Sequence, residues 1–175
     1  MIHTTLYIAT SKDGFIADKN GSLDWLSYAE HEGEDYGFTE FFGSVDYLIM
    51  GEKTYEQILS FGEWPYEGIH TFVFTNKDDL PNESEDVSFF KGTPKEFLDA
   101  VPIESLVTRI WLVGGGELAQ SFEKEGLIDE YIITELPLEL KDGIPLGINF
   151  NNPQIQKLET KKYKKDIIQK HFARI

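Results

Sequence analysis

The chain has no cysteine, so disulfide bonds and thiol chemistry are excluded, which fits a reducing compartment. It also lacks an N-terminal apolar stretch of the kind that forms a signal peptide. No apolar run approaches the length needed to cross a membrane. From these absences we expect a cytoplasmic protein with no membrane partner.

Positive charge is also scarce, because 16 Lys and Arg residues stand against 31 Asp and Glu, a formal net charge of −15. Such a chain would be repelled by nucleic acid and by anionic lipid, so neither is expected as a partner. Two acidic clusters, Glu30–Asp35 and Asp78–Asp86, are typical of solvated loops rather than of a metal cage. We therefore expect no metal, and a small molecule as substrate.

Apolar and aromatic residues are plentiful, with 13 Phe, 8 Tyr and 3 Trp in 175 residues. This content is sufficient for a packed core, and the length suits one compact domain. We find no internal repeat, low-complexity tract or linker. The sequence therefore predicts a single domain over residues 1–175.

Strands and helices alternate along the chain, which is typical of an α/β fold. Apolar and β-branched runs predict strands at 2–10, 45–50, 71–75, 87–90, 109–113 and 131–136. Runs at 157–163 and 167–174 flank Lys164-Lys165-Asp166 and predict a terminal antiparallel hairpin. Helices are predicted at 36–42, 54–62, 93–100 and 117–124. We expect a mostly parallel sheet with an antiparallel edge.

Helix ends are indicated by capping residues. Thr93 is followed by Pro94 and Glu96, which predicts a capping box at a helix start. The same logic places Thr54 as the N-cap of another helix. Gly126 is the expected C-terminal stop of the helix that begins at Glu117.

A strand-like run ending at Val113 passes directly into Gly114, Gly115 and Gly116, and a helical pattern follows. Glycines let the backbone approach a ligand closely, and a helix N-terminus offers unpaired N–H groups that suit a phosphate. A tight turn with nothing bound is the alternative interpretation. Three glycines at the carboxyl end of a strand favour the ligand, because open α/β sheets bind ligands there.

Two further segments have a related pattern. Residues 9–17 pass from a strand into a loop, and residues 48–56 pass from a buried strand through a glycine into a helix. Two of the three segments thus place a helix N-terminus after a strand. This geometry can hold a diphosphate from two sides.

With Leu127–Glu130 and the stretch 142–146, these ordered segments resemble the dihydrofolate reductase-like superfamily. The similarity is greatest to its bacterial riboflavin-biosynthesis reductase branch and extends from residue 2 to about residue 150. The resemblance implies a three-layer α/β/α sandwich that transfers hydride from a reduced nicotinamide cofactor to a small heterocycle, pterin-like or pyrimidine-like. Relatives in this branch are commonly dimers, so a homodimer is expected.

The resemblance also assigns cofactor-binding positions. Small or apolar residues beside the nicotinamide would be Ala9, Ile16 and Ala17. A second phosphate-binding turn would comprise Gly51, Lys53 and Thr54, and Thr75 and Lys77 would lie near the adenosine. The diphosphate and nicotinamide ribose would lie over Val113, Gly114, Gly115, Gly116, Glu117 and Leu118. Such proteins often have a cis peptide in the glycine run, and Gly114–Gly115 is the matching bond.

Structural roles compete with several of these assignments. Thr54 is equally explained as a helix cap, and Asp13-Gly14 as a simple turn. Trp25 would close over the substrate in a protein of this family, but tryptophan is more often a core residue. Lys77 lies beside Asp78 and Asp79 and could be an ordinary surface charge.

Glu52 is a departure from the family pattern, because NADPH-using relatives usually carry an arginine there that pairs with the 2′-phosphate. A carboxylate at this place would repel that phosphate. Lys53 or Lys77 could compensate. NADPH remains the expected cofactor, with NADH as the alternative that Glu52 leaves open.

The source of the proton is a separate question, because reduction of a C=N bond needs a proton as well as a hydride. By spacing, Glu30 and Thr134 correspond to the acidic residue and the supporting threonine of folate reductases. A solvated loop glutamate is the alternative for Glu30.

The leading hypothesis is an NAD(P)H-dependent reductase of a small heterocycle. A genuine dihydrofolate reductase and a pyrimidine reductase of riboflavin synthesis are narrower versions. The chain shows no basic cluster for the phosphorylated substrate of the second. A non-catalytic nucleotide-binding module that keeps the cofactor cleft is the alternative from another class.

Overall fold

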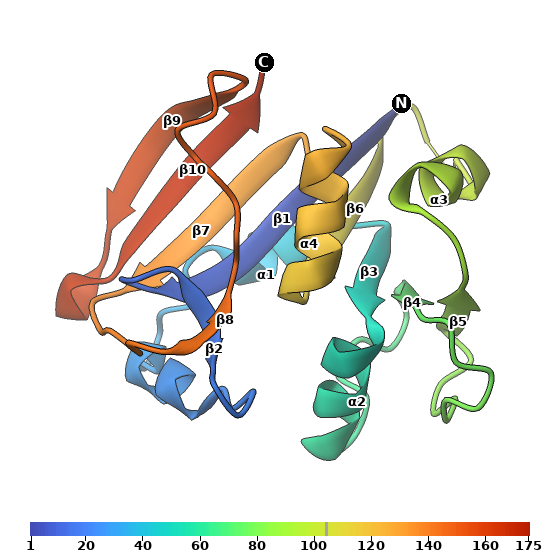
Figure 1. Ribbon diagram of the computed structural model, residues 1–175, viewed down its shortest axis with the longest axis horizontal. Helices are drawn as coiled ribbons and strands as arrows, with labels where there is room; N and C mark the ends of the chain where they lie inside the picture. The colour runs from blue at the N-terminus through green and yellow to red at the C-terminus, as the bar shows by residue number, and fades with distance from the viewer. Residues whose placement is uncertain (104) are drawn as a thin grey trace.

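An eight-stranded sheet forms the centre of the computed structural model, which describes residues 1–103 and 105–175 (Figure 1). Its order is β5-β4-β3-β6-β1-β7-β10-β9. The strands are β1 (Ile2–Ser11), β3 (Tyr47–Gly51), β4 (His70–Phe74), β5 (Val87–Phe90), β6 (Thr108–Gly114), β7 (Glu130–Leu136), β9 (Ile155–Lys162) and β10 (Ile168–Arg174). Neighbours from β5 to β7 are parallel, and β10 is antiparallel to both β7 and β9. The predicted mostly parallel sheet with an antiparallel edge hairpin is confirmed.

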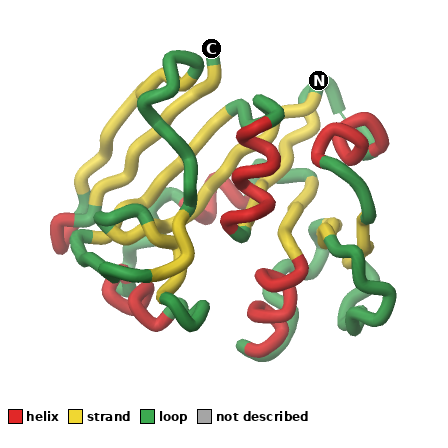
Figure 2. The backbone as a smooth tube through the Cα atoms, viewed as in Figure 1, coloured by secondary structure: helices red, strands yellow, loops and turns green. Residues whose placement is uncertain are grey.

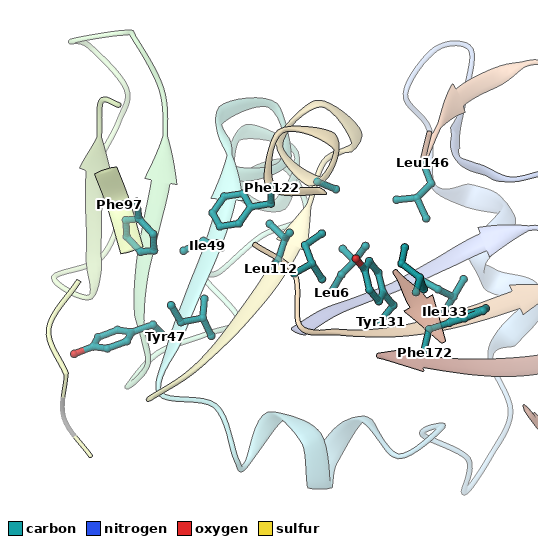
Figure 3. Close-up of a cluster of buried hydrophobic side chains, with 14 of the residues drawn as sticks. Leu6, Tyr47, Ile49, Phe97, Leu112, Phe122, Tyr131, Ile133, Leu146 and Phe172 are labelled. Atoms are coloured by element: carbon teal, nitrogen blue, oxygen red, sulfur yellow. The ribbon is translucent and has the colours of Figure 1, made fainter. Parts of the chain in front are cut away.

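Helices cover both faces of the sheet, giving three layers (Figure 1). On one face, Phe97 of α3 (Pro94–Ala100) and Phe122 of α4 (Gly116–Lys124) join the main core with Ile49 (Figure 3). On the other face, α2 (Glu52–Ser60) contributes Tyr55 to a second cluster with Met50. Ile49 and Met50 are consecutive on β3, so this strand is buried on both sides, as its apolar run predicts.

The short helix α1 (Phe38–Phe42) lies behind the sheet in the view of Figure 1 and packs against β6. Its aromatic rings pack edge-on against Trp111, with centroids 5.2 Å away for Phe38 and 5.9 Å for Phe41. Two 3-10 helices complete the helical elements, η1 (Asp24–Ala29) and η2 (Lys164–Asp166). No helix in the described ranges is long and apolar enough to cross a membrane.

A second, two-stranded sheet was not predicted. It pairs β2 (Phe15–Asp18) with β8 (Gly143–Pro145), and Figure 2 shows β8 as a short strand inside the long loop between β7 and β9. Gly143 permits this pairing, because a Cβ there would lie 2.3 Å from the Ala17 carbonyl oxygen. A strand of three residues with glycine at one end and proline at the other gives no alternating pattern to detect.

Asp13 attaches the loop between β1 and β2 to the loop that precedes β8. Its carboxylate accepts a hydrogen bond from Ser11 Oγ and from the backbone N–H groups of Leu140 and Lys141, at 2.6, 3.1 and 2.8 Å. Gly14 takes a φ of +88° and closes the turn onto the Ser11 carbonyl. The turn interpretation of Asp13-Gly14 is therefore confirmed.

Helix starts follow the sequence in one case and not in another. At α3, Thr93 and Glu96 form the predicted capping box. At α2, the prediction that Thr54 is the N-cap is wrong. Gly51 is the N-cap, the helix begins at Glu52, and Thr54 lies within the first turn. The acidic Glu52 is compatible with a helix start, because carboxylates are stabilised near the positive end of the helix dipole.

Removal of the α3 cap should weaken the fold measurably. We expect Thr93→Ala to lower the free energy of unfolding by about 1 kcal/mol, because it deletes the side chain that accepts from the Glu96 N–H. Urea denaturation measures the change. Lys95→Ala on the exposed side of the same helix is the control and should stay within about 0.5 kcal/mol of wild type. Equal stability of the two variants would contradict a role for the capping box.

Candidate functional site

A cleft of about 1360 Å³ opens at the carboxyl ends of β1, β3, β4 and β6. Ordinary small-molecule pockets measure about 300–1,000 Å³, so this cleft has room for more than one bound molecule. Its walls come from the three segments that the sequence singled out, together with residues 19–26 and 57–66. Twelve of the fourteen predicted cofactor-binding residues line it, and the two that do not are Gly114 and Lys77.

Two helix N-termini face this cleft without a side-chain cap. Gly51 caps α2 and Gly115 caps α4, and neither helix has a hydrogen bond from a capping side chain. In contrast, α3 has a complete capping box. The first N–H groups of α2 and α4 are therefore available to an acceptor in the cleft, and both carry partial positive charge. A diphosphate is the kind of group that two such helix ends can hold.

Each position of the glycine run requires glycine for a different structural reason. Gly114 has a φ of +128°, a conformation that residues with a Cβ rarely adopt. A Cβ at Gly115 would lie 3.2 Å from Thr54 Oγ1, so this glycine lets the run approach the first turn of α2. A Cβ at Gly116 would lie 2.8 Å from the Pro145 carbonyl oxygen, so Gly116 is required by packing against β8. The peptide bond between Gly114 and Gly115 is cis, as the resemblance implied.

A charged cluster lies at the β4 side of the cleft. The Thr75 hydroxyl donates to Glu52 Oε2 at 2.5 Å, and Lys77 Nζ lies 3.2 Å from Glu52 Oε1 and 3.2 Å from Glu56 Oε1. The bonds from Thr75 and then from Lys77 lower the pKa of the Glu52 carboxyl, so it is ionised at neutral pH. The same two glutamates raise the pKa of Lys77.

A second ion pair joins the two helix starts. Lys53 Nζ of α2 lies 3.9 Å from Glu117 Oε1 of α4, and both side chains are exposed. A pair this long and this exposed contributes little to stability. It does place one positive and one negative charge at the entrance between the two helix N-termini.

The opposite end of the cleft is apolar. Ala9, Ile16 and Ala17 line its inner part, where β1 and β2 meet. Its outer part lies between α2 and the segment 19–26, and we call this part the substrate end. Apolar side chains that line the substrate end are Leu23, Leu26, Ile58, Phe61 and Tyr66. Sequence reasoning missed them, because single apolar residues in loops and helix faces carry no motif.

Tyr66 is held by other aromatic rings at the substrate end. Its ring packs edge-on against Trp64 at 5.3 Å and Trp111 at 5.6 Å between centroids. Burial raises the pKa of the Tyr66 phenol, so it is neutral at physiological pH. Glu63 and Lys19 are the charged side chains that line this end in the described ranges.

A hydrogen bond links the two walls of the substrate end. Gln57 Nε2 of α2 donates to the Gly21 carbonyl at 2.7 Å. This bond joins α2 to the loop after β2, and residues of both segments line the cleft.

Three predicted residues, Glu30, Trp25 and Thr134, are not among the described residues that line the cleft. Glu30 is exposed at the end of η1, where its backbone carbonyl accepts from Lys165 Nζ at 3.1 Å. Trp25 is half-buried in η1, and its Nε1 is covered by protein. Their spacing matched the resemblance, but the structure gives neither a position facing the cleft.

Thr134 belongs to a buried hydrogen-bond network. Its Oγ1 accepts from Gln169 Nε2 at 3.0 Å, and the same amide donates to the Tyr7 hydroxyl at 3.1 Å and the Tyr36 carbonyl at 3.0 Å. Gln169 and Thr134 are both buried. The network connects β1, β7 and β10 to the loop before α1, and it gives Thr134 a structural role.

A smaller hollow of about 740 Å³ lies beside the C-terminal end of α4. The Arg174 side chain at this hollow donates to Glu123 Oε2 and the Tyr131 hydroxyl, both at 2.7 Å, and to the Ile128 carbonyl at 3.0 Å. Its guanidinium is therefore already paired within the protein. No group of three or more His, Asp or Glu residues that could hold a metal ion occurs in residues 1–103 and 105–175.

The mostly parallel sheet with its antiparallel edge, the glycine run after β6 and the two uncapped helix ends are those of a dihydrofolate reductase-like protein. Comparison with known proteins narrows this class. The family model of the RibD C-terminal domain matches residues 64–169. The chain belongs to this family.

Similar proteins cover almost the whole chain. The uncharacterized protein YwjB of Bacillus subtilis (strain 168) is 38% identical over 172 residues, which are 98% of this chain and 97% of YwjB. The uncharacterized protein YyaP of the same strain is 26% identical over 186 residues, and the match covers 94% of this chain and 90% of YyaP. The crystal structure of a candidate riboflavin biosynthesis protein from Shewanella sp. PV-4 has a TM-score of 0.86 and 33% identity, over 99% of both chains.

The structural role of the Thr134 network can be tested at its centre. We expect Gln169→Leu to lower the free energy of unfolding by about 1–3 kcal/mol, because it leaves the buried Thr134 hydroxyl without its donor. Chemical denaturation measures this. Gln156→Leu on the exposed face of β9 is the matched control, expected within about 0.5 kcal/mol. Unchanged stability of Gln169→Leu would contradict the structural role.

Proposed function

We propose that this protein is an NAD(P)H-dependent reductase of a small, flat heterocycle, pterin-like or pyrimidine-like. The observation that carries the proposal is one continuous cleft with two chemically different ends. One end has two uncapped helix N-termini for a diphosphate, and the other has apolar and aromatic walls. A hydride donor and a flat acceptor could therefore bind side by side.

The residues present fit a nicotinamide dinucleotide. Gly51 and Gly115 approach each other closely, and a Cβ at Gly51 would lie 3.9 Å from the Gly115 nitrogen. Side chains at either position would fill the space between the helix starts. Thr54 lies opposite Gly115, where its hydroxyl could donate to a phosphate oxygen. The chain's own atoms thus provide a narrow, donor-rich cradle.

When bound, the reduced nicotinamide supplies the hydride. The inner wall of Ala9, Ile16 and Ala17 would lie against its ring and keep water away from the reacting carbon. At the substrate end, Tyr66 and Leu26 would provide apolar surface for a flat ring. The Gln57–Gly21 bond would hold the two walls at a fixed separation.

The proton that accompanies the hydride needs a source other than Glu30 in this proposal. Glu30 is exposed at the end of η1, Thr134 is buried in the Gln169 network, and neither residue lines the cleft. Glu63 is the acidic side chain that lines the substrate end. We place the proton supply with water that enters beside Glu63.

The charges at the substrate end also favour one kind of substrate. Folates carry an anionic glutamate tail, and the substrate of the riboflavin pyrimidine reductases carries a phosphate. Among the described residues, Lys19 is the one basic side chain that lines this end, and the negative charge of Glu63 offsets its positive charge. We therefore propose a substrate without an anionic tail, which sets the activity apart from both narrower versions.

The first test is cofactor binding followed by hydride transfer. We expect NADH or NADPH to quench tryptophan fluorescence with a Kd well below 1 mM, a binding free energy beyond about −4 kcal/mol. Oxidation of the bound dinucleotide by tail-free pterins and pyrimidines is then followed by absorbance. Binding without turnover of any flat acceptor would favour the non-catalytic nucleotide-binding module. Failure of both dinucleotides to bind would overturn the proposed function.

A variant at the helix start sharpens this test. Thr54→Val keeps the shape of the side chain and removes the hydroxyl that faces Gly115. We expect binding of both dinucleotides to weaken by roughly tenfold or more, since a hydrogen bond to a charged group is worth about 1.5–3 kcal/mol. Thr160→Val on the exposed β9 strand is the matched control and should bind as wild type does. Equal binding by the two variants would exclude Thr54 from the phosphate site.

A further inference from the structure

We infer that Glu52 makes the cofactor site selective for NADH over NADPH. The inference rests on the proposed function and specifies which dinucleotide that cleft takes. It departs from the expectation, based on the family resemblance, that NADPH is the cofactor. Four observations carry it: the place of Glu52 along the cleft, its partners, the charge around it and the position of Lys53.

The sheet order places Glu52 where an adenosine ribose would lie. Strands β4, β3, β6 and β1 are consecutive neighbours, and α2 and α4 begin directly after β3 and β6. A diphosphate between those two helix starts would extend toward β1 on one side and toward β4 on the other. The β1 side leads to the apolar substrate end, so the nicotinamide belongs there. The adenosine half then lies over the end of β4, beside Glu52 and Thr75.

Two groups that could hold a 2′-phosphate, the Thr75 hydroxyl and the Lys77 ammonium, are already bound to carboxylates. The Thr75 hydroxyl has one hydrogen and donates it to Glu52. The same hydroxyl oxygen accepts from the Lys77 N–H at 3.0 Å. Lys77 Nζ is shared by Glu52 and Glu56, and Lys77 does not line the cleft, whereas Glu52 does. The face that this cluster presents to a ligand is therefore the Glu52 carboxylate.

The charge of the cluster has the wrong sign for a phosphate. Glu52 and Glu56 contribute two negative charges and Lys77 one positive charge, so the cluster has a net charge of −1. A 2′-phosphate monoester would bring further negative charge against it. The 2′- and 3′-hydroxyls of an unphosphorylated ribose are donors, and a carboxylate is the acceptor that suits them.

Lys53 does not correct this balance. Its ammonium lies 3.9 Å from Glu117 at the entrance between α2 and α4, which is the position of the diphosphate. Neither lysine therefore compensates for the charge of Glu52. Lys77 is paired with Glu52 and Glu56 and does not line the cleft, and Lys53 lies at the diphosphate rather than at the adenosine ribose.

The wild-type protein gives the first test, without any substitution. Its Kd values for NADH and NADPH are measured by fluorescence, and those for ADP-ribose and 2′-phospho-ADP-ribose by calorimetry, in the same buffer. We expect the unphosphorylated ligand of each pair to bind at least about tenfold more tightly, a difference of about 1.4 kcal/mol. Tighter binding of the 2′-phosphorylated ligands would overturn the inference.

Substitution of Glu52 should reverse the preference. Glu52→Gln removes the negative charge and leaves Lys77 paired with Glu56 alone, so NADPH binding should improve and the NADPH-to-NADH affinity ratio should rise by about tenfold or more. Glu117→Gln is the matched control, because it removes one charge from the first turn of α4 at the diphosphate. We expect it to change both affinities in the same direction and to leave their ratio within about twofold. A ratio that moves equally in both variants would contradict a specific role for Glu52.

The outcomes separate this inference from the proposed function. If neither dinucleotide binds the wild-type protein, the proposed function fails. If both bind and NADPH is preferred, the reductase proposal stands and the selectivity inference is wrong.

Discussion

The close approach between the first turn of α2 and the glycine run after β6 is the contact on which the site depends. Parallel pairing of β3 with β6 brings the two strand ends together, and a register shift after Ile49 pairs Met50 with Gly114. Gly51 and Gly115 then face each other, with Thr54 against Gly115. No side chain of this region caps α2 or α4. The stability of these helices must therefore come from the packing of Tyr55, Ala119 and Phe122, which leaves their N-termini free for a ligand.

Features that depend on local chemistry could be predicted from the sequence. Thr93 and Glu96 satisfy each other within four residues, and Gly126 takes a φ of +69° directly after α4. The strands followed from apolar runs, because β3 and β6 are buried on both faces by helices of two layers. The order of these elements and the glycine run together identified the family.

Features that depend on which side chains meet in space could not be predicted. Spacing placed Glu30 and Thr134 together as catalytic partners, but one lies at an exposed helix end and the other in a buried network centred on Gln169. The sequence around Thr54 predicted it as the N-cap of α2, but Gly51 is the N-cap and the helix begins at Glu52. The pairing of Lys77 with Glu52 and Glu56 crosses between β4 and α2, so no local pattern signals it.

Net charge and local charge have different consequences in this protein. The net charge of −15 acts over distances that salt screens, so it disfavours anions in general and says little about a cleft with its own donors. The N–H groups of α2 and α4 and the Thr54 hydroxyl can hold one diphosphate against this field. At the β4 end, the Thr75 hydroxyl and the Lys77 ammonium are already bound to Glu52. Under the proposed function, one cleft would accept the diphosphate of a dinucleotide and disfavour the additional 2′-phosphate of NADPH.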